Sequence, residues 1–207
     1  MSDASVPAAL LLMDYQRGIC EPDGRLGGPS GLAAEIARRG VLANAAAVLR
    51  AARAAGLTVV HVRVAFDEHH TLRTNRTPRF DRYQTEGLLR IGTPEADFSP
   101  EVAPEPGEIV ITKGCVGAFV GTALGEILTA RGVRELYLGG VATHMVVEST
   151  ARYAADAGYA VHVIEDLCAS HTPEPHEYAI TTTLPAFARI IDSGTVLGWL
   201  GAGVGAA

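Results

Sequence analysis

The stretch Glu135-Leu-Tyr-Leu-Gly-Gly-Val-Ala-Thr143-His-Met-Val146-Val-Glu-Ser-Thr150 joins an apolar strand to the first turns of a helix. The short, mostly apolar run over residues 135–139 is typical of a strand that is buried in a parallel sheet. From Thr143 onward, apolar residues recur at helical spacing until Gly158, where a glycine can end the helix. This stretch therefore predicts one strand–helix unit of an α/β protein.

The same alternation of short apolar runs and amphipathic runs continues on both sides of this unit. Further strands are predicted over Ala8–Met13, Leu57–Val64, Glu108–Thr112, Ala160–Ile164 and, last, near Thr195–Leu197. Further helices are predicted over Val41–Ala55, from Thr122 to Gly132, and from about Glu174 or His176 to Phe187. We therefore expect a three-layer α/β/α Rossmann-like fold around a six-stranded, mainly parallel sheet. Residues 66–107 fit neither element, and a connection of that length is typical of a lid, a binding loop or an oligomer contact.

Composition narrows the class of protein. The 207 residues are 48% hydrophobic and 19% charged, which predicts a single globular domain over residues 1–207. The net charge of -6 argues against a nucleic-acid binder. The apolar run from Val6 to Met13 is much shorter than the ~20 residues of a membrane-spanning helix and no basic segment precedes it, so we expect a cytoplasmic protein without membrane contact. Cys20, Cys115 and Cys168 have no metal-type spacing and are expected as reduced thiols.

Polar residues stand at the ends of three predicted strands. Asp14 and Lys113 follow their strands directly, and Thr143 follows a short turn and opens a helix. Ligands of open parallel sheets bind at the carboxyl ends of the strands. Such residues are also common structural caps, so a site requires that all three converge on one crevice.

Four segments resemble one known family in order and spacing. They are Leu-Leu-Leu-Met-Asp14-Tyr-Gln16, Lys113-Gly-Cys-Val-Gly-Ala-Phe119, Gly140-Val-Ala-Thr143 with the helix after it, and Val-Ile-Glu-Asp166. Together they resemble the isochorismatase-like hydrolases, also called cysteine hydrolases, over almost the whole chain. The resemblance implies a doubly wound sheet, a homodimer or homotetramer, a small-molecule substrate, no cofactor, and a non-proline cis peptide at Val141-Ala142. It also implies an Asp-Lys-Cys triad that hydrolyses small amides, ureides or carbamoyl compounds.

The chain departs from this pattern at the nucleophile. The resemblance places Asp14 at the acid/base aspartate and Lys113 at the lysine, but Val146 at the position of the cysteine. A valine side chain can neither attack a carbonyl nor transfer a proton. A shifted alignment would not restore the thiol, because the chain has no cysteine between Val116 and Leu167. If the alignment holds, a thioester mechanism at this position is excluded.

Acid catalysis by Asp14 is the leading hypothesis. Isochorismatases within the superfamily also lack the cysteine and cleave a vinyl ether by protonating its enol carbon, and they resemble this chain in a histidine at the position of His144. We therefore expect Asp14 as general acid and Lys113 as its partner. The candidate substrate contacts are Gln16, Phe119, Ala142, Thr143, His144 and Arg82. The arginines between Arg73 and Arg90 give this loop a local excess of positive charge that suits an anionic substrate, although such residues are often only solvated or lie at subunit interfaces.

Several alternatives stay open. The protein could be an amide or carbamoyl hydrolase in which water attacks directly with Asp14 as base, or a catalytically inactive small-molecule binder. Cys115 follows Lys113 by two residues and offers a thiol, but a cysteine this close to an apolar strand is most often a core residue. The run Asp67-Glu-His-His70 occupies roughly the region in which related nicotinamidases bind zinc, yet it reads more simply as a solvated loop, so no metal is expected.

Overall fold

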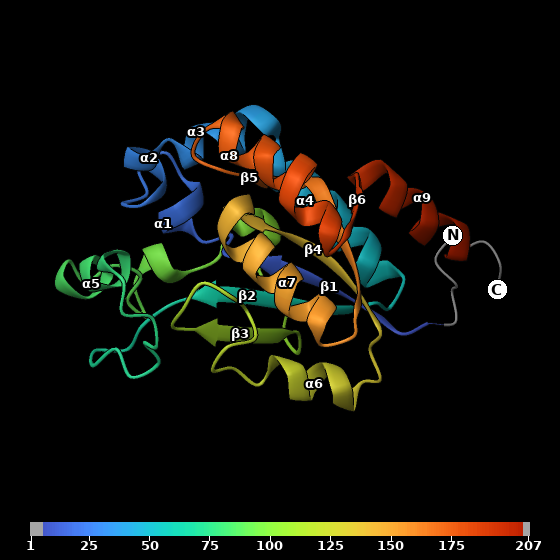
Figure 1. The fold of residues 1–207 in the computed structure, drawn as a ribbon, viewed down its shortest axis with the longest axis horizontal. Helices are drawn as coiled ribbons and strands as arrows, with labels where there is room; N and C mark the ends of the chain where they lie inside the picture. The colour runs from blue at the N-terminus through green and yellow to red at the C-terminus, as the bar shows by residue number, and fades with distance from the viewer. Residues whose placement is uncertain (1–5, 205–207) are drawn as a thin grey trace.

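The computed structural model describes residues 6–204 and shows one six-stranded sheet in the order β3-β2-β1-β4-β5-β6 (Figure 1). All neighbouring strands are parallel. The strands are β1 (Ala8–Met13), β2 (Thr58–Val64), β3 (Ile109–Lys113), β4 (Glu135–Val141), β5 (Ala160–Ala169) and β6 (Arg189–Ile191). The predicted α/β/α architecture is confirmed, and the sheet is parallel throughout rather than mainly parallel.

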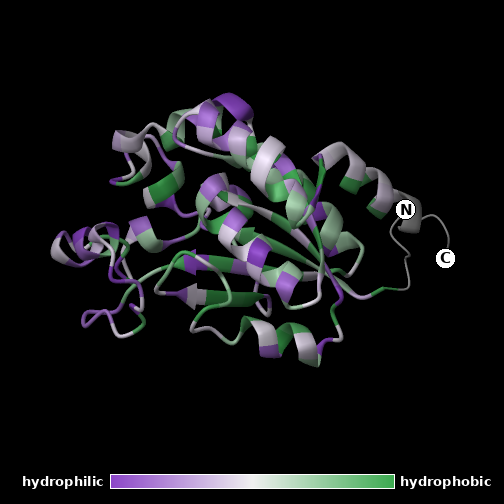
Figure 2. Ribbon diagram, viewed as in Figure 1, coloured by the Kyte–Doolittle hydropathy of each residue, from purple (hydrophilic) through white to green (hydrophobic). Residues whose placement is uncertain are grey.

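Alternate residues of the central strand β1 build two separate hydrophobic cores. Leu10 and Leu12 face one side, where α3 (Leu32–Arg39), α4 (Val41–Ala54) and α9 (Ser193–Val204) pack. Leu11 and Met13 face the other side, which α6 (Leu124–Ala130) and α7 (Glu148–Asp156) cover. A strand presents successive side chains to opposite faces, so a strand buried on both sides must be apolar at every position. Figure 2 shows the hydrophobic colour concentrated in the strands and the hydrophilic colour on the outward-facing helices and loops.

Five of the six predicted strands are confirmed within a few residues, and the last one is wrong. Residues Thr195–Leu197 lie in helix α9, and the edge strand is β6, a few residues earlier. The Asp192 carboxylate accepts a hydrogen bond of 2.7 Å from the backbone N–H of Thr195 and so caps the first turn of α9. Val196 is buried against the core beside α4, which explains an apolar run that resembled a strand.

The predicted helices are present with local irregularities. Helix α4 and helix α6 match their predictions, and the Oγ1 of Thr122 accepts a hydrogen bond from the N–H of Leu124 at the start of α6. The helix after β4 begins with a π-helical turn, η3 (Thr143–Val147), and continues as α7. The helix predicted to end at Phe187 is instead α8 (Pro173–Tyr178), a π-helical turn η4 (Ala179–Thr183) and a 3-10 turn η5 (Leu184–Ala186).

The long connection over residues 66–107 contains one regular helix. Helix α5 (Pro78–Thr85) lies there, followed by two 3-10 turns, η1 (Pro94–Ala96) and η2 (Pro100–Val102). In Figure 1 the β2 and β3 arrows point toward the side of the molecule that carries α5 and α1 (Arg17–Cys20), with α2 (Gly27–Ser30) above them. These elements therefore lie beyond the carboxyl edge of the sheet. None of the helices in the described part of the chain is long and apolar enough to cross a membrane.

Candidate active site

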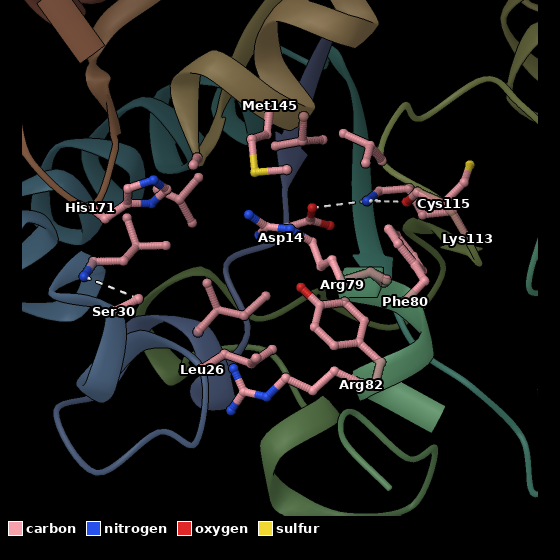
Figure 3. A pocket seen from close by; sticks show the side chains of 18 residues that line it. Asp14, Leu26, Ser30, Arg79, Phe80, Arg82, Lys113, Cys115, Met145 and His171 are labelled. Carbon is pink, nitrogen blue, oxygen red and sulfur yellow. Dashed lines mark hydrogen bonds and ion pairs between the residues drawn. The ribbon is translucent and has the colours of Figure 1, made fainter. Parts of the chain in front are cut away.

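A cavity of about 410 Å³ opens at the carboxyl edge of the sheet (Figure 3). Asp14 follows β1, Lys113 ends β3, and Ala142 follows β4, and all three border this cavity. Val146, from the π-helical turn after β4, borders it as well. The parallel sheet thus brings four of the predicted site residues to one crevice, as the topology requires.

Asp14 and Lys113 form a buried ion pair at the base of the cavity. The Nζ of Lys113 donates to the Oδ2 of Asp14 at 2.9 Å and to the carbonyl oxygen of Cys115 at 3.1 Å. Lys113 is 1% and Asp14 5% exposed. The Oδ1 of Asp14 is buried and has no hydrogen-bond partner among the residues that the structure describes. Asp14 also has a φ of 63°, a left-handed backbone that is uncommon for residues other than glycine and recurs at functional sites.

Burial raises the pKa of the Asp14 carboxyl above its ordinary value of 3.8, although the charge and the hydrogen bond of Lys113 lower it in part. Desolvation penalises the charged form of a carboxyl group, so the protonated form persists to higher pH than in water. A carboxylic acid of raised pKa beside a fixed cation can give a proton to a substrate and take one back. The pair therefore supplies acid–base chemistry to this cavity.

The wall that β4 and the following turn contribute is apolar. Val141, Ala142, Met145 and Val146 border the cavity together, and Val146 is 2% exposed. The peptide bond Val141-Ala142 is cis, as the resemblance implied. At the position that the resemblance assigns to a nucleophile, the cavity therefore meets methyl groups rather than a thiol.

Thr143 lies behind this wall and is fully buried. Its Oγ1 is 2.8 Å from the Nδ1 of His176, and the Nε2 of His176 is 2.9 Å from a Glu165 oxygen. Arg39 pairs with the same carboxylate and also donates to the carbonyl oxygen of Cys168. The Thr143 hydroxyl therefore belongs to a buried hydrogen-bond chain at the start of the helix. Of the three strand-end residues, Asp14 and Lys113 converge on the cavity and Thr143 does not border it.

His144 does not border the cavity itself, but its ring contacts His171, which does. Its Nδ1 is 2.8 Å from the Oγ of Ser170, and its ring meets that of His171 edge-on, with 4.7 Å between centroids. His171 borders the cavity. Burial lowers the pKa of both histidines, and the positive charge of Arg79 contributes to each shift. Both rings are therefore neutral hydrogen-bonding groups at pH 7.

The other two predicted contacts occupy different places. Gln16 is fully buried, its Nε2 donates to the carbonyl oxygens of Val64 and Ala96, and its Oε1 accepts from the Val64 N–H. Its amide therefore ties the end of β1 to β2 and to the long connection. Phe119 stacks on Tyr153 with 4.7 Å between centroids and borders a second hollow of about 440 Å³.

Helix α5 contributes cationic and aromatic groups to the cavity, and Arg82 is the one among them that the sequence named as a contact. Arg82 borders the cavity, but its side chain is 54% exposed and pairs with Glu86 at 2.7 Å. Arg79 borders it too, and Figure 3 shows its side chain pointing into the cavity toward Asp14, whereas Arg82 points to the far rim. Tyr83 lies one turn after Arg79, on the same face of α5, and also borders the cavity. Arg79 belonged to the arginine-rich loop in the sequence, but nothing in the pattern separated it from Arg82.

The remaining candidates are the run over residues 67–70 and Cys115. Within residues 6–204, no group of three or more His, Cys, Asp or Glu side chains is arranged to hold a metal ion. The Asp67 carboxylate accepts hydrogen bonds from the backbone N–H groups of His69 and Thr71 and so caps its own turn. Cys115 borders the cavity, and its Sγ lies 3.4 Å from the carbonyl oxygens of Gly117 and Val120.

Comparison with known proteins agrees with this architecture. The family model of the Isochorismatase domain matches residues 8–195. An isochorismatase family protein from Desulfovibrio vulgaris is 26% identical, with a TM-score of 0.82 over 95% of this chain and 99% of its own. A second one, from Burkholderia thailandensis, is 28% identical, with a TM-score of 0.73 over 95% of this chain and 100% of its own. A cysteine hydrolase from Pseudomonas syringae pv. phaseolicola shares the fold, with 22% identity and a TM-score of 0.83 over 98% of this chain and 100% of its own. Because the family match spans most of the sequence, this chain belongs to the isochorismatase family of hydrolases.

Proposed function

We propose that this hydrolase cleaves the vinyl ether bond of a small anionic, isochorismate-type substrate, with Asp14 as general acid. The observation that carries the proposal is the pairing of a buried carboxyl of raised pKa with an apolar wall that includes Val146. An acid that protonates carbon needs no nucleophile at the wall opposite, and an apolar wall suits the methylene carbon that receives the proton. The cavity, at about 410 Å³, is within the roughly 300–1,000 Å³ of small-molecule sites.

Asp14 takes part in two of the proton transfers of the reaction. Asp14 gives its proton to the terminal methylene carbon of the enol ether, which becomes a methyl group and leaves an oxocarbenium ion beside the new carboxylate. Water then adds to the cationic carbon and returns one proton to Asp14. In the hemiketal so formed, the hydroxyl proton passes to the ether oxygen as the ether C–O bond breaks, and pyruvate and the neutral alcohol leave. One water is consumed, and Asp14 ends the cycle protonated.

Lys113 holds the acid in place during both steps. Its Nζ binds Oδ2, so Oδ1, which has no hydrogen-bond partner within residues 6–204, is the oxygen that we assign to the transferred proton. When Asp14 becomes a carboxylate, the ammonium of Lys113 stabilises the new charge in a site of low polarity. Without this cation, the buried acid would be weaker and would give up its proton more slowly.

Arg79 supplies the positive charge for an anionic substrate. Lys113 and Arg82 are each paired with an acid of the protein, whereas the Arg79 side chain points into the cavity. A guanidinium group can bind a carboxylate through two parallel hydrogen bonds, which fixes orientation as well as charge. We therefore assign the substrate carboxylate to Arg79, with Tyr83 and His171 as neutral neighbours.

The thiols of the chain support the same conclusion. Cys20 and Cys168 are buried, and burial raises the pKa of Cys168 to about 12 and that of Cys20 further. A thiol that is not ionised at neutral pH is a poor nucleophile. Of the three cysteines, Cys115 alone borders the cavity.

The test is pyruvate release from isochorismate by the purified protein and by two variants. The proposal expects release that Asp14→Asn abolishes and that Cys115→Ala leaves within a factor of about three. Release that depends on Cys115 instead of Asp14 would overturn the mechanism. No pyruvate but ammonia from small amides would favour an amide or carbamoyl hydrolase with direct water attack, and binding without turnover would favour an inactive homologue.

A further inference from the structure

Helix α5 carries the cavity groups Arg79 and Tyr83, yet it lies beyond the edge of the sheet (Figure 1). The short helix has eight residues, and all of them except Phe80 and Tyr83 are exposed. An isolated helix of that length is not stable in water. Contacts outside the helix therefore fix its position: Phe80 and Tyr83 pack against Phe66 in the core, and the polar side of α5 is held separately.

Arg73 is the residue that connects α5 to the sheet edge. Its backbone forms an isolated parallel bridge with Gly114, the residue directly after Lys113. The approach is close enough that a Cβ on Gly114 would lie 1.8 Å from the carbonyl oxygen of Leu72. Residues 72 and 73 thus rest on the turn that follows the catalytic lysine, and only glycine allows this contact.

The guanidinium group of Arg73 is buried among acceptors. Its side chain is 6% exposed, and its Nε donates to the carbonyl oxygen of Asn75 at 3.0 Å. Its two terminal nitrogens donate to the side chains of Asp81 and Gln84. Asp81 and Gln84 are three residues apart on α5, so they share one face of the helix. The rigid fork of an arginine is suited to holding two such acceptors at once.

The two faces of α5 therefore make different contacts. At 3.6 residues per turn, Asp81 and Gln84 point away from the face that carries Arg79 and Tyr83. One face binds the arginine beside Lys113, and the other borders the cavity. A rotation or shift of α5 would move the Arg79 guanidinium relative to Asp14.

We propose that Arg73 is a positioning residue that sets the place of α5, and through it the affinity for the anionic substrate. This inference deepens the proposed function and rests on it for its kinetic consequence, but its structural part does not. Arg73 does not border the cavity; it acts through Asp81 and Gln84. It contributes to substrate binding and leaves the proton transfer from Asp14 unchanged.

The first experiment needs no substrate. Hydrogen exchange of the backbone amides of residues 79–86 is measured in the wild type, in Arg73→Gln and in Arg76→Gln, which removes the same charge from an exposed arginine three residues later. We expect exchange in α5 to rise at least tenfold in Arg73→Gln, with β1 unchanged in both variants and α5 unchanged in Arg76→Gln. Should Arg73→Gln fail to fold, Asp81→Ala, which removes an acceptor from an exposed side chain, is expected to show the same localised rise. Unchanged exchange in α5 would overturn the proposal.

The second experiment uses pyruvate release from isochorismate. Arg73→Gln is expected to raise KM about tenfold with kcat within a factor of three, and Arg73→Lys to recover part of the loss because a lysine keeps the charge but lacks the planar fork that reaches both Asp81 and Gln84. A fall in kcat at constant KM would contradict the assigned role. If the wild type releases no pyruvate, the proposed function fails, and the exchange experiment alone decides whether Arg73 positions α5.

Discussion

The Nζ of Lys113 binds one oxygen of the Asp14 carboxyl at 2.9 Å, and the other oxygen is buried without a hydrogen-bond partner among residues 6–204. Burial raises the pKa of this carboxyl, and Lys113 limits the rise. A buried pair of this kind contributes little to stability on its own, because desolvation offsets most of the attraction. The pair therefore serves chemistry rather than stability, because Lys113 adjusts the acid strength of Asp14.

The pH dependence of turnover follows from that arrangement. Asp14 works in its protonated form, so kcat is expected to be constant at low pH and to fall as the pH rises through the raised pKa of Asp14. In Lys113→Met the charge that lowers this pKa is gone, so the falling limb moves to higher pH. The pH–rate profiles of both proteins check this. A limb that moves to lower pH in Lys113→Met would refute the assignment of Asp14 as the titrating acid.

The two arginines of α5 that border the cavity should differ in their effect on substrate binding. Arg79→Gln is expected to raise KM by roughly 10–100-fold, because a hydrogen-bonded charge is worth about 1.5–3 kcal/mol. Arg82→Gln is the matched control, since its side chain is paired with Glu86 and 54% exposed, and its KM should change by less than threefold. Steady-state kinetics distinguish them. Equal losses in both variants would argue against Arg79 as the carboxylate contact.

Placing a thiol at the position of Val146 should not create an amidase. Val146→Cys removes one methyl group from a buried site, so we expect the free energy of unfolding to fall by about 1 kcal/mol. Pyruvate release should stay within a few-fold of the wild type, since Asp14 and Lys113 are unchanged. Amidase assays on small carbamoyl compounds and urea denaturation measure both effects. Gain of amide hydrolysis would instead identify a scaffold that had lost its original chemistry with its cysteine.

Glu108 does not border the cavity, and its interactions with Arg53 and His61 are expected to affect stability alone. The Glu108 carboxylate accepts hydrogen bonds of 2.8 Å from Nε and Nη2 of Arg53, and one of 2.9 Å joins it to His61. These partners, Arg53 first, lower the pKa of Glu108 from 4.5 to about 2. A lowered pKa stabilises the fold above pH 4.5, and this contribution is lost as the pH falls toward about 2.

Glu108→Gln is therefore expected to lower the free energy of unfolding by about 2 kcal/mol at pH 7. The difference in free energy of unfolding between the wild type and Glu108→Gln should be smaller at pH 3 than at pH 7. Urea denaturation at the two pH values tests this. A gap that widens on acidification would contradict the sign of the pKa shift.

Most of the fold could be predicted because its signals are local. The apolar runs of β1, β2 and β4 are buried on both faces, and glycines end several of the helices that connect the strands. The error at Thr195–Leu197 arose because a short apolar run has no period that separates a strand from a buried helix. Packing against α4 decides between them, and that contact is not visible in the sequence.

The candidate site likewise contains residues that the sequence could predict and residues that it could not. Asp14, Lys113 and Val146 follow from strand ends and from the family pattern, and the structure brings them to one cavity. Arg79 and Tyr83 could not be chosen in advance, because α5 is only eight residues long and its placement depends on contacts with residues outside the helix, Arg73 among them. Gln16 and Thr143 do not border the cavity, because their side chains bond to groups distant in sequence, Gln16 to the end of β2 and Thr143 to His176 of α8. The expected homodimer or homotetramer stays a prediction.

The most direct test of the central claim is to follow isochorismate cleavage in deuterated water and to trap pyruvate at once by enzymatic reduction. Protonation of carbon by Asp14 predicts a product methyl group that carries one deuterium from solvent, and no product with Asp14→Asn. A methyl group without solvent deuterium, or full turnover by Asp14→Asn, would contradict acid catalysis by Asp14.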